Sequence, residues 1–230
     1  MKKLLLTAAT LMFVSFGFAQ KTYDKTGAFG IYKTDWALVE KDGLLGFISS
    51  GGTEVVKPIY HHISKFGTYV KDWALVEKDE KLGFITLQGY EIIKTKYHSI
   101  SKFGIYRKDW ALVEKDDLLG FISTDGVEVV KPKYHNISKF GAYKKEWALV
   151  EKDDLLGFIN LDGVEVVKPK YNAISRFGAY RKDWALVEKD GLLGFISMDG
   201  TEVVKPKYES IVKGSGLIGI IRGKKEEIQP

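Results

Sequence analysis

The chain has 230 residues, of which 45% are hydrophobic and 13% aromatic, so it carries ample material for a folded core. Its formal net charge is +5, but basic and acidic residues are interleaved throughout, which argues against the basic patch of a nucleic-acid-binding protein. The absence of cysteine excludes disulfides, thiolate metal sites and a cysteine nucleophile.

The N-terminal segment has the arrangement of a bacterial secretory signal peptide. Lys2 and Lys3 give it a positive start, an apolar stretch continues to Phe18, and small residues precede an expected cut between Ala19 and Gln20. This apolar stretch is short for a membrane span, and no later stretch reaches that length. We therefore expect an exported protein, periplasmic or extracellular, without an integral membrane segment once the signal peptide is removed.

A repeat of 37 residues dominates the rest of the sequence. The phrase W-A-L-V-E-K-D opens with each tryptophan, and a glycine followed by Phe-Ile comes ten residues later. We expect a signal peptide over residues 1–19 and a single repeat domain over 20–230. Its five repeats cover approximately 23–59, 60–96, 97–133, 134–170 and 171–207, and a partial repeat or cap covers 208–230.

The first half of each unit is typical of a β-hairpin. In the first unit, alternating residues predict a strand over Trp36–Glu40 and a returning strand over Leu45–Ser49. Asp42-Gly43 between them is a tight-turn pair, and Asp190-Gly191 repeats it.

The second half of the unit predicts two further strands. Glu54–Val56 begins a third strand rich in β-branched residues. Pro58 lacks a backbone N–H and therefore fits a strand end or a sheet edge. Tyr60 to Phe66 is a candidate for a fourth short strand.

The fold class is all-β, and the repeated charges indicate how the units are arranged. Glu40, Lys41 and Asp42 recur in every unit, and stacking them about 4.8 Å apart, as in a β-helix, would place like charges together. This disfavours a tight β-helix but allows a superhelix or propeller blades. Because a unit of 37 residues is small for a four-stranded blade, we expect an open array, a solenoid or superhelix of β-hairpin units, with a small-bladed β-propeller as the alternative. The charged run Lys224–Glu227 would protect the last edge.

The unit W-A-L-V-E-K-D-G-L-L-G-F-I-S-x-x-G-x-E-V-V-K-P-x-Y, followed by I-S-x-F-G, resembles the bacterial WG β-repeat family. Family units typically read G-x-A-x-V-x-x-x-G-K-W/Y-G-Y/F-I-D-x-x-G-x-x-V-I-P-x-x-Y-D, and the match extends from Tyr23 to Tyr208. One position departs, because leucine, as at Leu45, replaces the aromatic residue before the glycine. The resemblance implies β-rich exported or surface-associated repeats without a common enzymatic activity.

The sequence contains no recognisable catalytic or metal-binding constellation. His61, His62, His98 and His135 do not converge on one ion, because His62 is next to His61 and would point to the opposite strand face, while the others lie in separate units. Asp116-Asp117 lacks the pattern of a calcium loop and fits a turn. We expect no enzymatic activity, no cofactor and no metal.

Two functions remain, and they are distinguished by the aromatic residues. The first is a binding or scaffold module at the cell envelope that holds another protein along an extended surface. The second is binding of a carbohydrate or cell-wall polysaccharide on stacked aromatic rings, for which packing between units is the competing interpretation. The candidate residues are Trp36, Trp73, Trp110, Trp147, Trp184, Tyr69, Tyr106, Tyr143 and Tyr180.

Overall fold

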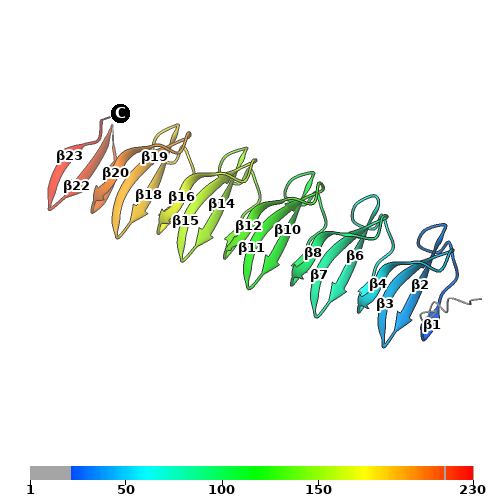
Figure 1. The fold of residues 1–230 in the computed structure, drawn as a ribbon. Helices are drawn as coiled ribbons and strands as arrows, with labels where there is room; N and C mark the ends of the chain where they lie inside the picture. The colour runs from blue at the N-terminus through cyan, green and yellow to red at the C-terminus, as the bar shows by residue number, and fades with distance from the viewer. Residues whose placement is uncertain (1–21, 215, 230) are drawn as a thin grey trace, which may run out of the picture.

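A computed structural model describes residues 22–214 and 216–229, and every regular element of these residues is a strand (Figure 1). The expected signal peptide and its cut between Ala19 and Gln20 lie outside the described residues. Within the described residues, no helix could cross a membrane.

The strands form six antiparallel sheets. The first contains β1 (Lys25–Thr26), β2 (Trp36–Lys41), β3 (Leu44–Ser49) and β4 (Glu54–Tyr60), paired in that order. The next four sheets repeat this order with β5 (His62–Ile63), β6 (Trp73–Lys78), β7 (Lys81–Thr86) and β8 (Glu91–Tyr97); β9 (Ser99–Ile100), β10 (Trp110–Lys115), β11 (Leu118–Ser123) and β12 (Glu128–Tyr134); β13 (Asn136–Ile137), β14 (Trp147–Lys152), β15 (Leu155–Asn160) and β16 (Glu165–Tyr171); β17 (Ala173–Ile174), β18 (Trp184–Lys189), β19 (Leu192–Ser197) and β20 (Glu202–Tyr208).

A three-stranded sheet ends the array and is called the cap below. It contains β21 (Ser210–Lys213), β22 (Leu217–Ile221) and β23 (Lys224–Glu227). All four residues of the edge strand β23 are exposed, as expected for a charged last edge.

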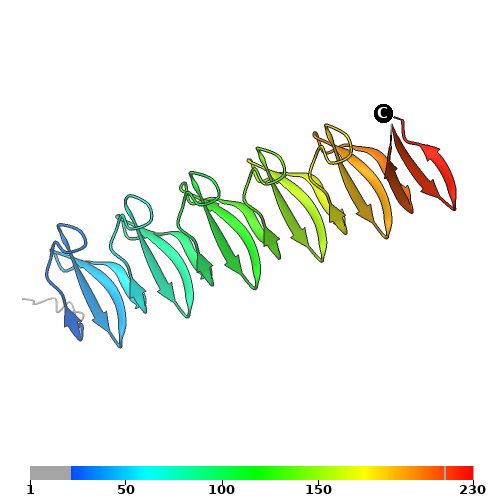
Figure 2. The ribbon, with the colours of Figure 1, turned by 180° about the vertical axis from the view of Figure 1, so that it is seen from behind.

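The sheets stand one behind another in an open row, with the first sheet and the cap at opposite ends (Figures 1 and 2). Strands pair only within a sheet, and no sheet closes into a barrel. The predicted open array is therefore confirmed, and the alternative, a closed propeller, is not formed.

The predicted hairpins are present in every repeat. Lys41 pairs with Leu44 across a two-residue turn, in which Asp42 has φ 52° and Gly43 φ 75°. Positive φ at both positions is the backbone of a type I′ turn, whose twist suits a two-residue hairpin. Asp116 and Asp117 adopt the same conformation, so this acidic pair is a turn and not a calcium loop.

The edge strand β4 extends further than predicted and includes Pro58 near its end. Its only neighbour in the sheet is β3, so the missing N–H of Pro58 breaks no second ladder. A register shift lies between Leu45 and Phe47, where Gly46 lies against the β4 backbone. A Cβ on Gly46 would lie 2.5 Å from the carbonyl oxygen of Val56, so only glycine fits there.

The fourth strand predicted over Tyr60 to Phe66 is shorter than predicted. Only His62–Ile63 is a strand, and this strand, β5, pairs with β6 of the following sheet. Tyr60 is the last residue of the edge strand, and its ring is buried between the first and second sheets. The chain therefore crosses there to begin the next sheet.

The hydrophobic core lies between the sheets. Each sheet turns a face rich in aromatic residues, such as Trp36, Phe47 and Tyr60, toward an aliphatic face of the next sheet, such as Ala74 and Ile85. We call the contact between two consecutive sheets a junction. The same packing recurs at the following junctions, and Leu217 of the cap and Ile228, just after it, cover the last aromatic face. Each unit therefore depends on its neighbour for a core, as in other repeat stacks.

Candidate functional site

The five candidate tryptophans lie inside the junctions. Their exposed fractions are 4% to 8%. Each ring packs on the phenylalanine of its own sheet, with centroids 5.2 Å apart for Trp110 and Phe121. A phenylalanine of the following loop contacts the first four of these tryptophans edge-on, as Phe140 contacts Trp110, whereas Trp184 is buried in one cluster with Leu217 and Ile228. The tryptophans therefore offer no open face on which a sugar could stack. The set is Trp36, Trp73, Trp110, Trp147 and Trp184.

The candidate tyrosines are half-buried at the border of the same cores. Tyr106 packs edge-to-face on Phe121, with centroids 5.4 Å apart. Tyr69, Tyr143 and Tyr180 repeat this contact in their own units. Because one edge of each ring packs against the core, these tyrosines belong to the border of the core and are not free stacking platforms.

A basic side chain covers the tryptophan in four of the five repeats. Arg107 lies over Trp110 at 4.7 Å from the ring centroid, and Lys144 lies over Trp147 at 4.0 Å. Lys144 also donates to the carbonyl oxygen of Met198 at 2.6 Å, in the turn of the next sheet. The side chain thus adds a cation–π contact and ties two sheets together. Lys33 and Arg181 are the other two, and Val70 takes this position in the second repeat.

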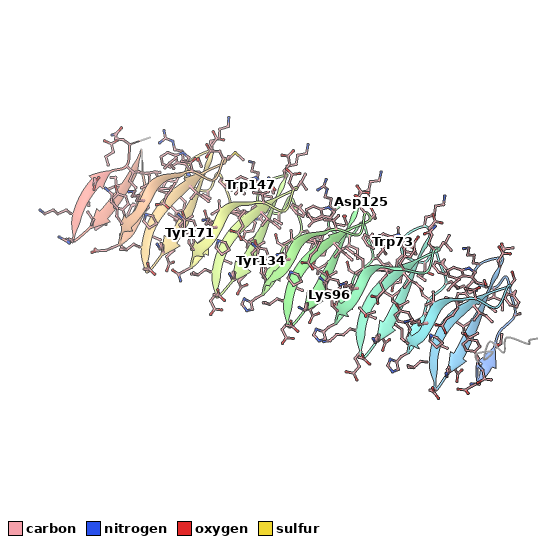
Figure 3. The ribbon with its side chains drawn as sticks, viewed as in Figure 1. Trp73, Lys96, Asp125, Tyr134, Trp147 and Tyr171 are labelled. Carbon is pink, nitrogen blue, oxygen red and sulfur yellow. The ribbon has the colours of Figure 1, made fainter. Side chains whose placement is uncertain are left out.

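A tyrosine, a glutamate and a lysine form a second tie between sheets. The Tyr134 hydroxyl and the Lys133 ammonium both donate to Glu165 of the next sheet, each at 2.7 Å. Tyr134 and its equivalent Tyr171 are labelled in Figure 3. Equivalent triads contain Lys96, Tyr97 and Glu128, and Lys170, Tyr171 and Glu202. At the first junction, Tyr60 donates to Glu91 at 3.2 Å, and Ile59 replaces the lysine.

These contacts shift the ionisation of both partners. Burial, and then the hydrogen bond to Glu165, raise the pKa of Tyr134 above its usual range, and the equivalent causes raise the pKa of Tyr171 to about 12. Burial alone would raise the pKa of Glu165, but the hydrogen bonds from Lys133 and Tyr134 outweigh it and lower that pKa. The triad therefore holds a charged carboxylate and a neutral phenol.

The repeated histidines stabilise the hairpin turns. Nδ1 of His98 accepts a hydrogen bond from the backbone N–H of Asp116 at 3.3 Å, and His61 and His135 do the same in their units. Asn172 supplies an amide oxygen at the equivalent place. A shared local hydrogen bond explains why these residue types alternate. Among the described residues, no group of three or more His, Cys, Asp or Glu could hold a metal ion.

A row of exposed and half-buried apolar side chains runs along the edge-strand side of the array, and we call it the apolar row. Turn glycines place each unit against the edge strand of the unit before it; a Cβ on Gly126 would lie 2.7 Å from Ile92. The next residue, Val127, is 56% exposed, and its equivalents Tyr90 and Val164 are 64% and 58% exposed. The apolar row consists of the exposed Tyr90, Ile92, Val127, Val164 and Val203 and of the half-buried Val55, Val129 and Val166, which also pack against the cores.

A row of lysines accompanies the apolar row, two residues further along each edge strand. All five are exposed, and none forms an ion pair within residues 22–214 and 216–229. This lysine row consists of Lys57, Lys94, Lys131, Lys168 and Lys205. An exposed apolar patch with a polar rim is a candidate interaction surface. The sequence did not reveal this surface, because the repeat positions that form it recur as regularly as those that form the core.

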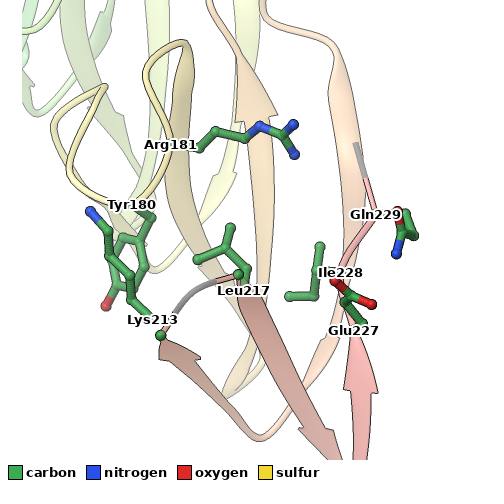
Figure 4. Close-up of a pocket in the computed structure, with 9 residues that line it drawn as sticks. Tyr180, Arg181, Lys213, Leu217, Glu227, Ile228 and Gln229 are labelled. Atoms are coloured by element: carbon green, nitrogen blue, oxygen red, sulfur yellow. The ribbon is translucent and has the colours of Figure 1, made fainter.

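A cavity of about 310 Å³ lies where the cap meets the fifth sheet (Figure 4). Tyr180 and Arg181 come from the loop before β18, and Lys213 comes from the end of β21. Leu217 and Glu227 complete the wall from β22 and β23. Gly214, which also lines the cavity, stands at the position where the internal repeats have a phenylalanine.

The fold and its junctions define an all-β tandem-repeat protein with an open array of sheets. The sequence matches the family model described as "WG containing repeat" over residues 46–81, 120–155, 157–192 and 194–213. The chain therefore belongs to the WG-repeat family. Gly46, Gly120, Gly157 and Gly194, which begin these matches, are glycines held against the edge-strand backbone.

Comparison with solved structures finds distant likenesses. Kluyveromyces lactis Hsv2p has 14% sequence identity and a TM-score of 0.27, over 85% of this chain and 71% of that chain. Citrobacter koseri AztD has 15% identity and a TM-score of 0.26, over 89% and 71%. The CRINKLY WD40 ectodomain of the Arabidopsis thaliana receptor kinase ACR4 has 9% identity and a TM-score of 0.23, over 82% and 73%. No curated protein matches the sequence.

Proposed function

We propose that the protein is an exported, non-enzymatic binding or scaffold module at the cell envelope, which holds another protein along the apolar row and the lysine row. The observation that carries this proposal is the recurrence of one exposed surface in successive units of an open row. Each unit contributes a small apolar patch and one unpaired lysine, as Val127 and Lys131 do. Several weak contacts on one rigid scaffold add up to useful affinity.

The composition of this surface defines the partner. An extended protein segment with apolar side chains and acidic residues complements it in both hydrophobicity and charge. A polysaccharide has less support, because the five tryptophans are buried and the tyrosines are held against the core. The acidic residues that recur in each unit serve turns and junctions, such as Asp116 and Glu165, which supports a role without catalysis.

Crosslinking from the apolar row tests the binding proposal. A photoreactive amino acid at Val127 or Val164 is expected to trap one protein partner in cells that make the chain. The same residue at Asp154, an exposed hairpin-turn position, is the matched control and should trap little. Equal trapping from all three positions, or trapping of polysaccharide only, would overturn the proposal.

Export has its own test. The positive start, the apolar stretch and the small residues before Gln20 support removal of a signal peptide. Mass spectrometry of the protein recovered outside the cytoplasm is expected to find a chain that begins at Gln20. A chain that retains Met1 and remains in the cytoplasm would overturn export without affecting the binding proposal.

A further inference from the structure

The second repeat carries the bulkiest side chains of the apolar row. Tyr90 stands in the turn before β8, is 64% exposed, and is the aromatic residue of this row. Ile92, two residues later, is 37% exposed and stands where the other repeats have valine. The turn position of Tyr90 holds a smaller side chain in the other repeats, at Thr53, Val127, Val164 and Thr201.

The turn of the third sheet extends this apolar surface. A Cβ on Gly126 would lie 2.7 Å from Ile92, so the turn lies directly against that side chain. Val127, the next residue, is 56% exposed. Tyr90, Ile92 and Val127 therefore form a continuous apolar patch across the second junction, which we call the anchor patch.

The turn that carries Val127 lacks a hydrogen bond that the neighbouring turns have. In the second, fourth and fifth sheets, the turn accepts a hydrogen bond from the basic side chain that covers a tryptophan. Val70 takes the place of this basic side chain before the third sheet, and it has no donor to offer. The turn of the third sheet is therefore free of this tie and can adjust to a bound side chain. The three tied pairs are Lys33 and Leu87, Arg107 and Leu161, and Lys144 and Met198.

A hollow of about 190 Å³ adjoins the anchor patch and has charged walls. Ile92 and Gly126 line it together with Lys94, Lys96 and Glu128. Lys96 is already paired with Glu128 at 2.6 Å, whereas Lys94 forms no ion pair with another described residue. A carboxylate that enters the hollow would therefore find its complementary charge on Lys94.

We propose that the second repeat anchors the partner protein at one position along the array. An apolar side chain of the partner packs on the anchor patch, and an acidic side chain close to it pairs with Lys94. This proposal rests on the proposed function, in which another protein lies along the apolar row and the lysine row. Identical units would hold the partner equally well one unit further along, so a single position requires a unit that differs. Tyr90 supplies this difference, since tyrosine is enriched among the residues that dominate binding at interfaces.

Crosslinking from Val127 in two variant backgrounds tests the anchor. Tyr90→Thr should reduce the yield of the crosslinked product at least about tenfold, and Val164→Thr, the matched control, by less than about threefold. Both variants should fold, because Thr53 and Thr201 occupy the same position in the first and fifth repeats. Equal yields in the two variants would overturn the anchor and leave the proposed function standing. No product from the parent chain would overturn the proposed function and the anchor with it.

The charge and the position along the array have separate measurements. Lys94→Gln should reduce the yield several-fold, whereas Lys205→Gln, the equivalent change in the fifth repeat, should leave it unchanged. Mass spectrometry of the product from the parent chain should locate the crosslink in one short stretch of the partner sequence. Crosslinks in several separate stretches would show that the partner slides by whole units, and equal yields for the two lysine variants would exclude Lys94 as the charge partner; either result contradicts the proposal.

Discussion

The Tyr134 hydroxyl donates a hydrogen bond of 2.7 Å to the carboxylate of Glu165, which lies 31 residues later in the next sheet. Because the side chains of one sheet complete the hydrogen bonds of another, the array is stabilised at its junctions. Lys133 donates to the same carboxylate, so the glutamate is paired twice in a half-buried place. Charge-assisted bonds of this kind resist sliding between sheets, which apolar packing alone would tolerate.

Removal of the Tyr134 hydroxyl should weaken the third junction more than the equivalent change weakens the first. Tyr134→Phe is expected to lower the free energy of unfolding by about 1.5 to 3 kcal/mol, the range for a hydrogen bond to a charged group. Tyr60→Phe is the control, because the Tyr60–Glu91 bond is longer, at 3.2 Å, and has no lysine beside it. Urea unfolding measures both, and equal losses would contradict the importance of the triad.

Stability should depend on acid pH through the junction carboxylates. The pKa values of Glu128, Glu165 and Glu202 are lower in the folded chain than the ordinary value of 4.5. A lowered folded-state pKa stabilises above the unfolded-state pKa and loses this contribution as the pH falls. We therefore expect the unfolding midpoint to decrease below about pH 4.5. The variant with all three glutamates changed to glutamine should have a lower unfolding midpoint than the wild type at neutral pH. Its midpoint should also decrease less as the pH falls, and a decrease as steep as that of the wild type would refute this cause.

The junction tyrosines predict a second loss of stability, at alkaline pH. The pKa of Tyr171 is raised to about 12, and those of Tyr60, Tyr97 and Tyr134 are raised as well, from an ordinary value of 10.0. A raised folded-state pKa stabilises fully below the unfolded-state pKa and is lost as the pH rises. The unfolding midpoint should therefore decrease above about pH 10. Absorbance at 295 nm, which reports phenolate, should then increase together with the loss of sheet structure.

Much of the fold could be predicted from local signals in the sequence. The alternation in Trp36–Glu40 and the Asp42-Gly43 pair act within a few residues, so the hairpin and its turn were predicted correctly. The recurrence of like charges argued against a tight β-helix, and the short repeat favoured the open row over propeller blades. The partner of the short strand β5 could not be predicted, because His62 pairs with Glu77 only after the chain has crossed to the next sheet.

The contacts between sheets were beyond the reach of the sequence for a physical reason. Tyr134 and Glu165 belong to columns that recur in every unit, as do exposed lysines such as Lys131, so recurrence did not separate junction residues from surface residues. The positions at which one repeat lacks the residue common to the others were more informative. Ile59 replaces a triad lysine, Val70 replaces a basic cover of tryptophan, and Gly214 replaces a junction phenylalanine. Each departure marks a contact that the structure shows to be altered or missing.

The glycine that begins each family match should not tolerate a methyl group. A Cβ on Gly120 would lie 2.3 Å from the carbonyl oxygen of Val130 and 2.6 Å from the nitrogen of Pro132. Because both atoms belong to the backbone of the edge strand, the strand must shift, and Gly120→Ala should lower the free energy of unfolding by about 3 kcal/mol or more. Gly214→Ala is the control with open space around its Cβ and should cost less than about 1 kcal/mol. Similar losses of unfolding free energy in the two variants, measured by urea unfolding, would contradict the close approach of the edge strand to Gly120.

The hairpin turns contain strained residues whose replacement should stabilise the protein. Asp117 has φ 60° at the second turn position, where the first and fifth repeats have Gly43 and Gly191. A non-glycine residue in the left-handed region costs about 1 kcal/mol or more, partly offset by the larger entropy that glycine loses on folding. Asp117→Gly should therefore raise the free energy of unfolding by about 0.5 kcal/mol. The reverse substitution, Gly191→Asp, should lower it by a similar amount, and thermal unfolding in which both changes have the same sign would rule out turn strain as the cause.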